Sequence, residues 1–353
     1  MPDFDGSAQR DSRVTLEILT ASARELGLAA IGVAGVRRYL NVEVILCDRK
    51  AAGLSDTMEF TYRNPLRSSD PRLILAGARS VITTALAYGN DEQPDLDHSS
   101  LFAKYAKKDF YAELSAKLQA LADVICDAGY KCRVILDSNA MVDKEAASRA
   151  GIGTYLKNSL ISVKGVGTQI VLGSIVTDAW IARTKRRERL AGCGRCVKCI
   201  EACPTGAIAE FGVIDARRCL AWILQKPGVI DPSFLAVIGL KIYGCDICQD
   251  VCPYNASQPY DDCQSPDRIF EDILYFLSAG EKELLDKFSH LYIRDRDPSI
   301  LRRNALIALG NFPFMSSSKV DIALKVLRQF ATSSNDVLST HANWSISAIE
   351  SRV

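Results

Sequence analysis

No segment of this sequence is apolar over about 20 consecutive residues, the length that a helix needs to cross a bilayer. Residues 1–27 also lack the basic stretch and following apolar run of a secretory signal. The two absences predict a protein of the cytoplasm without a membrane partner. Cytosolic thiols stay reduced, so a framework of disulfides is not expected.

The sequence has no excess of charge of either sign. It holds 43 lysines and arginines against 42 aspartates and glutamates, which gives a net charge of +1. This balance excludes a uniformly basic coat for nucleic acid but leaves room for a local basic face. With 353 residues, 48% of them hydrophobic and 24% charged, we expect a globular protein of two or three domains.

Cysteine, by contrast, is abundant, and seven of the 12 cysteines fall in two short segments. Residues 193–204 read C-x2-C-x2-C-x3-C-P, and residues 245–253 read C-x2-C-x3-C-P. In two-cluster ferredoxins such a loop wraps three thiolates around one iron–sulfur cubane, and the cysteine before the proline ligates the other cluster. The spacing therefore predicts two [4Fe–4S] clusters.

The same rule divides eight cysteines between the two clusters, because Cys219 is the one unassigned cysteine between the segments. Zinc also fits paired C-x2-C hooks, but the third cysteine and the Cys-Pro endings favour clusters. The four remaining cysteines (Cys47, Cys126, Cys132 and Cys263) are interpreted as small buried hydrophobic residues. The predicted ligands are Cys193, Cys196, Cys199 and Cys252 for one cluster, and Cys203, Cys219, Cys245 and Cys248 for the other.

Helical and strand-like patterns alternate in the first half of the chain, which predicts an α/β domain. Short apolar runs at 29–33, 80–88 and 131–136 are typical of buried strands. Helical spacing is found at 14–26 and 101–128. Residues 161–163 and 169–176 predict a terminal hairpin.

Asp137 directly follows the predicted strand 131–136. Ligands of open α/β sheets collect at the carboxyl ends of strands, so a catalytic group would sit at this position. A turn or helix-capping aspartate is the simpler explanation of the residue type. Further on, Gly151 and Gly153 either end a helix or let the backbone approach a large ligand closely.

The last part of the chain has the pattern of a helical repeat. Residues 301–310 form an amphipathic segment, and their pattern of small and apolar residues returns about 37 positions later, at 340–346. Residues 319–330 supply a helix between them. Such helical stacks more often provide a binding surface than a catalytic site. The alternative is that these helices only support the cluster domain.

The pattern changes at two places, and these set the expected domain boundaries. The basic run 183–189 separates the α/β part from the cysteines, either as a solvated linker or as a strip that contacts phosphates. We expect domains at 1–180, 181–262 and 263–353.

Together these motifs resemble the epoxyqueuosine reductase family, iron–sulfur enzymes that complete queuosine in tRNA with cobalamin. The resemblance covers most of the chain in the same order. It implies an α/β cobalamin-binding domain, a ferredoxin-like domain with two clusters, and a C-terminal α-helical, HEAT-like repeat. The matching blocks are Arg63, Arg67 and Asp70-Pro71; Gly77 to Ile82; Tyr105-Ala106; Asp137-Ser138; Arg149 to Gly153 with Lys157-Asn158; Cys193 to Ala207; Tyr243 to Asn255; and Arg303 to Asn311.

The resemblance implies a monomeric oxidoreductase in which an external low-potential donor feeds electrons through the clusters to base-off cobalamin. The substrate would be an epoxide in the anticodon stem-loop of tRNA. Asp137 matches the family's acid, and a carboxyl shielded by the corrin would have a raised pKa. The three histidines lie in no Asp-x-His-x-x-Gly motif, which fits a cobalamin without a histidine ligand. Candidates for the corrin pocket are Lys157, Asn158, Gly244 and Asp246.

Three segments depart from the family's pattern. The usual Asp-Tyr-His is Asp109-Phe110-Tyr111 here. The usual Ser-Tyr-Leu-Thr-Ile-Glu after Cys219 is Leu220 to Gln225, and the usual Asp-Asp-Cys-Gln is Asp246 to Gln249. We expect these segments near the active site or the RNA face, where they bear on the choice of substrate.

Other functions fit parts of the pattern: a cobalamin reductase of a small molecule, as in the related reductive dehalogenases, a cobalamin-free electron-transfer protein, or a non-enzymatic RNA-binding module. A cavity lined by Asp137 and Asn158 that touches the Cys245 loop is expected of the cobalamin enzymes alone. A tRNA enzyme or an RNA-binding module also needs a continuous basic face. For that face we expect Lys104, Lys107, Lys108, Arg183, Lys185, Arg186, Arg187, Arg294, Arg296, Arg302 and Arg303 to lie together.

Overall fold

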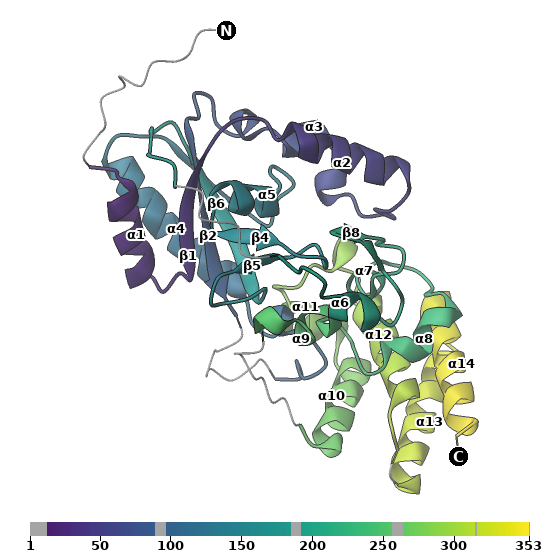
Figure 1. Cartoon of the computed structure of the whole chain (residues 1–353). Coiled ribbons are helices and arrows are strands. Elements are labelled where there is room, and N and C mark those ends of the chain that lie inside the picture. Colours follow the sequence, from purple (N-terminus) through teal and green to yellow (C-terminus); the bar gives the residue numbers. More distant parts are fainter. Residues whose placement is uncertain (1–12, 89–96, 185–191, 256–263, 315, 353) are drawn as a thin grey trace.

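A computed structural model describes residues 13–88, 97–184, 192–255, 264–314 and 316–352. An α/β region, a middle region of short helices and loops, and a helical C-terminal part follow one another along the chain (Figure 1). In the part of the chain that is described, no helix is both long and apolar enough to cross a bilayer.

A four-stranded sheet in the order β1-β2-β6-β3 is the frame of the α/β region. Every neighbouring pair in it is antiparallel, so the rule that led to Asp137, which assumes parallel strands, does not describe this sheet. Strands β2 and β3 nevertheless end at the same edge, because both pair antiparallel with β6. The strands are β1 (Ala30–Gly35), β2 (Ser80–Ala87), β3 (Cys132–Leu136) and β6 (Ile170–Thr177).

Helices cover both faces of the sheet (Figure 1). On one face, α4 turns Leu114, Leu118 and Leu121 toward the sheet, and all three are fully buried. The α4 helix begins later than expected, because the carboxylate of Asp109 caps it by accepting the amide of Ala112 at 2.8 Å. The helices are α1 (Leu16–Glu25) and α4 (Phe110–Asp127) on one face and α5 (Asp143–Arg149) on the other.

The predicted terminal hairpin is wrong. Strand β5 (Ile161–Val163) pairs with β4 (Gly153–Tyr155), and β6 instead fills the centre of the main sheet between β2 and β3. Sequence spacing suggested a local pairing, whereas the buried β6 is paired on both sides with strands that come earlier in the chain.

An arm from the α/β region reaches over the middle region (Figure 1). Its far end is anchored by backbone and side-chain bonds, such as Ala216 N to Leu54 O at 2.8 Å and Trp222 Nε1 to Asp56 at 3.0 Å. The arm therefore ties the two regions together at a second place. It consists of α2 (Leu40–Ala51), η1 (Phe60–Tyr62), α3 (Pro65–Ser68) and η2 (Pro71–Leu73).

The middle region consists mainly of loops and short helices. Its hydrophobic core is small and includes Leu220, Ile223 and Leu235, with Ile307 of the C-terminal part. The elements are η3 (Lys104–Ala106), which belongs to the α/β region but contacts this one, α6 (Lys198–Glu201), β7 (Ile208–Glu210), β8 (Val213–Ile214), α7 (Leu220–Ile223), α8 (Pro232–Ile238), α9 (Ile247–Asp250) and η4 (Pro253–Asn255).

The C-terminal part is helical, as predicted, and α12 runs through its centre. Ten residues of α12 are buried, among them Leu301, Ala305 and Leu309. The cores of this part and of the 101–106 loop are continuous through aromatic side chains such as Phe102 and Phe276. The helices are α10 (Pro266–Ser278), α11 (Glu281–Lys287), η5 (Arg294–Arg296), α12 (Ser299–Asn311), α13 (Ser317–Ala331) and α14 (Asp336–Glu350).

Candidate active site and cluster loops

Two loops of the middle region carry seven of the eight predicted cluster cysteines. The first loop runs into α6, and the second surrounds α9, which packs against α6. Cys219 stands at the N-cap of α7. All eight cysteines are partly buried and unpaired.

The eight thiols fall into two spatial groups. Burial, and then the thiolate charges of Cys193 and Cys252, raise the pKa of Cys199. In the second group, burial raises the pKa of Cys248 to about 12, with contributions from Cys245 and then Cys219. The thiols whose charges act on one another are mostly those of Cys193, Cys196, Cys199 and Cys252 in one set, and those of Cys203, Cys219, Cys245 and Cys248 in the other.

The spacing within each group does not suit one small ion. In the described ranges, no three histidine, cysteine, aspartate or glutamate side chains converge as they would around a single metal ion. Thiolates around a four-iron cubane each bind a different iron and lie farther apart than ligands of one ion. The charge of Cys199 also contributes to the raised pKa of Cys248, so the two sets of thiols lie close to each other.

Lys157 lies against the first cysteine loop. Its backbone amide donates to the Sγ of Cys193 at 3.3 Å. Its ammonium group donates to the carbonyl oxygens of Gly194 and Cys196, at 3.0 and 2.9 Å. The side chain that we expected to face a corrin thus holds the loop of the first cysteine group.

Asp137 follows β3 in a left-handed backbone conformation, with φ +40°, which is unusual for a residue other than glycine. It is open to solvent, but enough protein surrounds it that burial raises the pKa of its carboxyl. The phenols of Tyr111 and Tyr243 are close enough for the Asp137 charge to act on them. Asp137 therefore lies near Tyr111 of the α/β region and Tyr243 of the middle region.

Two charged residues at the start of α5 were not predicted as site residues. The Oδ1 of Asp143 is buried and has no hydrogen-bond partner among the described residues. Burial, and then the charge of Asp137, raise the pKa of Asp143 well above its usual range. Next to it, Lys144 donates to the carbonyl of Ser159 at 3.0 Å, and burial lowers its pKa. No signal in the sequence sets this Asp-Lys pair apart from an ordinary pair at the start of a helix.

Asn158 is buried, with one half of its amide unsatisfied. Its Oδ1 accepts the amide of Leu160 at 3.2 Å, whereas its Nδ2 has no partner in the described part of the chain. A buried donor without an acceptor is costly, so this nitrogen is suited to a ligand that supplies one.

Gly244 and Asp246 are used for packing within the protein. Gly244 has φ +73°, and a side chain there would collide with Ala103 and Tyr105. Asp246 accepts the backbone amide of Lys104 at 2.6 Å. These contacts join the second cysteine loop to the α/β region.

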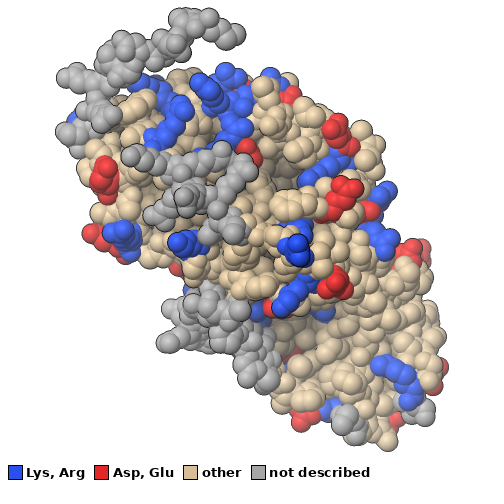
Figure 2. All heavy atoms as spheres, in the orientation of Figure 1, with Lys and Arg blue, Asp and Glu red and all other residues tan. Residues whose placement is uncertain are grey.

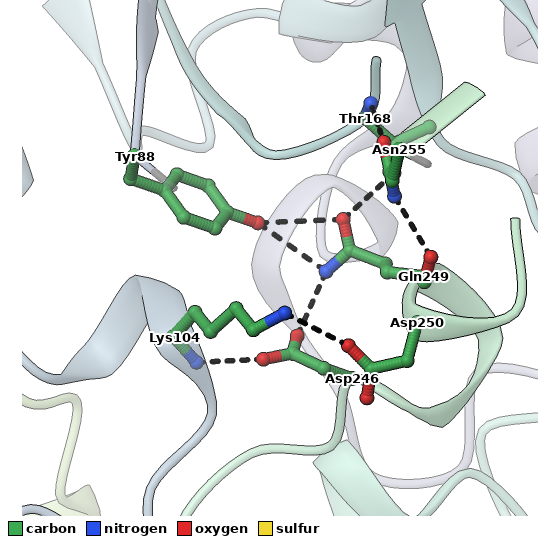
Figure 3. Close-up of polar contacts among 7 residues, drawn as sticks. All are labelled: Tyr88, Lys104, Thr168, Asp246, Gln249, Asp250 and Asn255. Carbon is green, nitrogen blue, oxygen red and sulfur yellow. Dashed lines mark hydrogen bonds and ion pairs between the residues drawn. The ribbon is translucent and has the colours of Figure 1, made fainter. Parts of the chain in front are cut away.

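A buried polar network completes this junction (Figure 3). Gln249 lies at its centre: its Nε2 donates to Asp246 at 2.8 Å, and its Oε1 accepts the hydroxyl of Thr168 at 2.9 Å. The Nε2 of Gln249 also donates to the hydroxyl of Tyr88, directly after β2, at 3.3 Å. Asn255 donates to the hydroxyl of Thr168 and to the Gln249 carbonyl, at 2.9 and 2.8 Å. The network fixes the Cys248 loop relative to the sheet.

Neither of two cavities beside the site matches the expected one. The larger, of about 410 Å³, touches Gly244, Cys245 and Asp246 but neither Asp137 nor Asn158. The smaller, of about 280 Å³, lies beside the Asp137 loop and is lined by Arg63, Asn64, Arg67 and Asn139.

Family models match two parts of the chain. "Epoxyqueuosine reductase QueG, DUF1730" matches residues 68–138, and "4Fe-4S double cluster binding domain" matches residues 192–255. The epoxyqueuosine reductase of Lactococcus garvieae is 31% identical over 342 residues, which cover 94% of this chain and 95% of the relative. The chain belongs to the epoxyqueuosine reductase family. It is therefore an oxidoreductase with a double 4Fe–4S cluster domain.

Solved structures of the family have the same fold. Epoxyqueuosine reductase from Streptococcus thermophilus superposes with a TM-score of 0.81 at 29% identity, over 95% of this chain and 90% of that one. A family structure with an epoxyqueuosine-modified stem loop of tyrosine tRNA gives a TM-score of 0.80 at 26% identity, over 94% and 89% of the chains. The family's architecture is thus present over nearly the whole chain.

The basic face that we expected of an epoxyqueuosine reductase is wrong in part. Lys107 and Arg303 are buried, with 3% and 0% of their surfaces exposed. Lys104, Lys108 and Arg302 form ion pairs with Asp250, Glu113 and Glu281, respectively. Residues 185–187 lie outside the described residues. In the view of Figure 2, lysines and arginines gather over the α/β region, and the helical tail shows few.

Two further expectations need correction. Of the departures from the family pattern, Leu220 is buried in the core of the middle region, and Trp222 is buried and donates to Asp56, so they bear on packing and not on an RNA face. Tyr111, by contrast, does lie near Asp137. Cys47 and Cys126 are exposed and Cys132 is half-buried, contrary to our interpretation as buried residues, and Cys263 lies outside the described residues.

Proposed function

We propose that this chain reduces epoxyqueuosine to queuosine in the anticodon loop of tRNA, using cobalamin fed by two [4Fe–4S] clusters. The observation that carries the proposal is the similarity, over 94% of the chain, to a family structure with an epoxyqueuosine-modified tRNA stem loop. The site supports it, because burial raises the pKa of the Asp137 carboxyl, and Lys144, close to it in the chain, lies within range of the charges of Cys219 and Cys248.

The ligand sets of the clusters are those that the spacing predicts. One cluster takes Cys193, Cys196, Cys199 and Cys252, and the other takes Cys203, Cys219, Cys245 and Cys248. The division of the thiols into these two groups in space supports the exchange of the fourth ligand. We place the cluster of Cys203, Cys219, Cys245 and Cys248 nearer the reacting epoxide. The charges of Cys219 and Cys248 act on the pKa of Lys144, which lies next to Asp143.

Two buried polar groups without a partner among the described residues fit a large polar cofactor. The unsatisfied Nδ2 of Asn158 and Oδ1 of Asp143 can bond to the amide groups that surround a corrin ring. The histidines are engaged elsewhere: His98 bonds to Asp272, and His290 and His341 bond to backbone groups. This supports binding without a histidine ligand. When bound, cobalamin supplies a strongly reducing cobalt centre. Lys157, Gly244 and Asp246 would lie at the border of the cobalamin pocket.

Asp137 would act as the general acid. The reduction takes up two electrons and two protons and releases the epoxide oxygen as water, so a proton donor must stand beside that oxygen. Burial raises the pKa of the Asp137 carboxyl, which favours the protonated form that the step needs.

We place the domains at 1–180, 181–262 and 263–353, in a monomer that takes electrons from an external low-potential donor. The first test is cobalamin binding to the anaerobically reconstituted protein, read from its visible spectrum and by electron paramagnetic resonance, followed by turnover of epoxyqueuosine tRNA. A base-off cob(II)alamin signal at one per chain is expected. Two intact clusters without bound cobalamin would leave an electron-transfer protein.

A further inference from the structure

The smaller cavity has a lining that suits an anion. Arg63, Asn64 and Arg67 come from the start of α3, and Asn139 comes from the loop that carries Asp137. Two guanidinium groups and two carboxamides can all donate hydrogen bonds into the space of about 280 Å³ between them.

The positive charge of this cavity is little compensated. Arg63 pairs with Glu59 at 3.9 Å, and the two side chains are 71% and 65% exposed, so this pair is weak. Across the described residues, Arg67 has no carboxylate within 4.0 Å, and it donates to the Oδ1 of Asn139 at 3.3 Å. The neighbouring Asp70 is occupied by Arg72 at 2.7 Å.

The cavity is also firmly attached to the loop of the proposed acid. The hydroxyl of Ser68 donates to the Asn139 carbonyl at 2.6 Å, and the amide of Val142 donates to the Ser68 carbonyl at 3.0 Å. Asn64 caps α3 by accepting the amide of Arg67 at 3.1 Å. An anion held here is therefore fixed relative to Asp137, two residues before Asn139.

We propose that this cavity binds a phosphodiester of the RNA strand beside the nucleotide that reacts, an assignment that rests on the proposed function. Arginine binds phosphate oxygens in a planar, bidentate manner. The same segment exposes Phe60 and Leu66, at 41% and 50%. Single-stranded RNA sites combine basic and exposed apolar or aromatic side chains in this way, which favours the RNA backbone over the phosphodiester of the cofactor.

The test compares Arg63→Gln and Arg67→Gln with the parent protein, all with clusters and cobalamin bound. Binding of a labelled anticodon stem-loop RNA is followed by fluorescence anisotropy over a series of salt concentrations. Each variant is expected to bind about tenfold more weakly, and the slope of log K against log salt is expected to fall by about 0.7 for each lost phosphate contact. Arg24→Gln, on α1 and exposed, is the control and should match the parent.

Each outcome has its own meaning. If the parent binds and turns over the RNA but both variants keep its affinity and slope, this cavity is not a phosphate site, while the proposed function stands. If the variants instead lose cobalamin, measured from the visible spectrum, and keep the salt slope, the phosphodiester is that of the cofactor and the assignment to RNA is overturned. Failure of the parent to bind RNA would overturn the proposed function itself.

Discussion

The backbone amide of Lys157 donates a hydrogen bond to the Sγ of Cys193. Hydrogen bonds and positive charge near cluster sulfurs stabilise the reduced cluster and raise its potential. The Lys157 ammonium group adds both charge and two bonds to the cysteine loop. If Cys193 binds a cluster as proposed, Lys157 therefore acts on the potential of that cluster as well as on the position of the loop.

Lys157→Met should therefore lower the reduction potential of one cluster and leave the other unchanged. The shift should be on the order of tens of millivolts, because a unit charge a few ångströms away is worth about 1 kcal/mol or more at a partly exposed site. A redox titration followed by electron paramagnetic resonance measures it. Lys164→Met, exposed in the turn after β5, is the control. If the Lys157 and Lys164 variants have equal reduction potentials, the charge of Lys157 does not influence the cluster.

Asp137→Asn should keep both clusters and bound cobalamin but lose turnover by about 10²–10⁴-fold, the usual contribution of a general acid. The acid works in its protonated form, and burial raises its pKa, so activity should fall as the pH rises through that pKa. The asparagine variant should lose this alkaline decline. Asp127→Asn, exposed at the end of α4, should retain the profile of the parent. Unchanged turnover in Asp137→Asn would remove the residue from the acid role.

Cys219→Ser should disable one cluster and spare the other, because each cubane needs four ligands. Bound iron should fall by about half, and one of the two spectroscopic signals should be lost or altered. Cys47→Ser is the matched control, since Cys47 is exposed on α2. Full iron content in the Cys219 variant would contradict the ligand assignment.

Arg303→Met should lower the free energy of unfolding by about 3 kcal/mol or more, since it leaves several buried carbonyls without a donor. Arg303 is completely buried, and burial lowers its pKa to about 10, so it remains charged at neutral pH. Urea unfolding measures the change. Arg328→Gln, 66% exposed, should stay within about 0.5 kcal/mol of the parent. The carbonyls that Arg303 reaches are those of Ile223, Leu224, Lys226 and Gly228.

The sequence was most informative where chemistry depends on local spacing. The cysteine pattern predicted a domain with two 4Fe–4S clusters, because a cluster loop is short and its geometry is set by neighbouring residues. The pairing of β6 between β2 and β3 could not be predicted in this way, since it depends on contacts between distant segments.

Charge was the least reliable guide to position. Arg303 was expected on a basic face for RNA, and only the tertiary structure shows carbonyls that converge on it. Asp143 and Lys144 look like an ordinary solvated pair at the start of a helix, yet both are enclosed by the fold. Their roles depend on what packs around α5, which spacing along the chain does not reveal.

The polar side chains of α12 bear on how this architecture can change during evolution. Asn304 donates to the carbonyls of Leu224 and Ile242, and Asn311 donates to those of Leu235 and Gly239, all in the middle region. A deletion of α12 together with the helices that follow it would remove these donors and Arg303. A shortened protein without these helices would therefore need compensating substitutions around the cysteine loops. This holds whether or not the helices contact RNA.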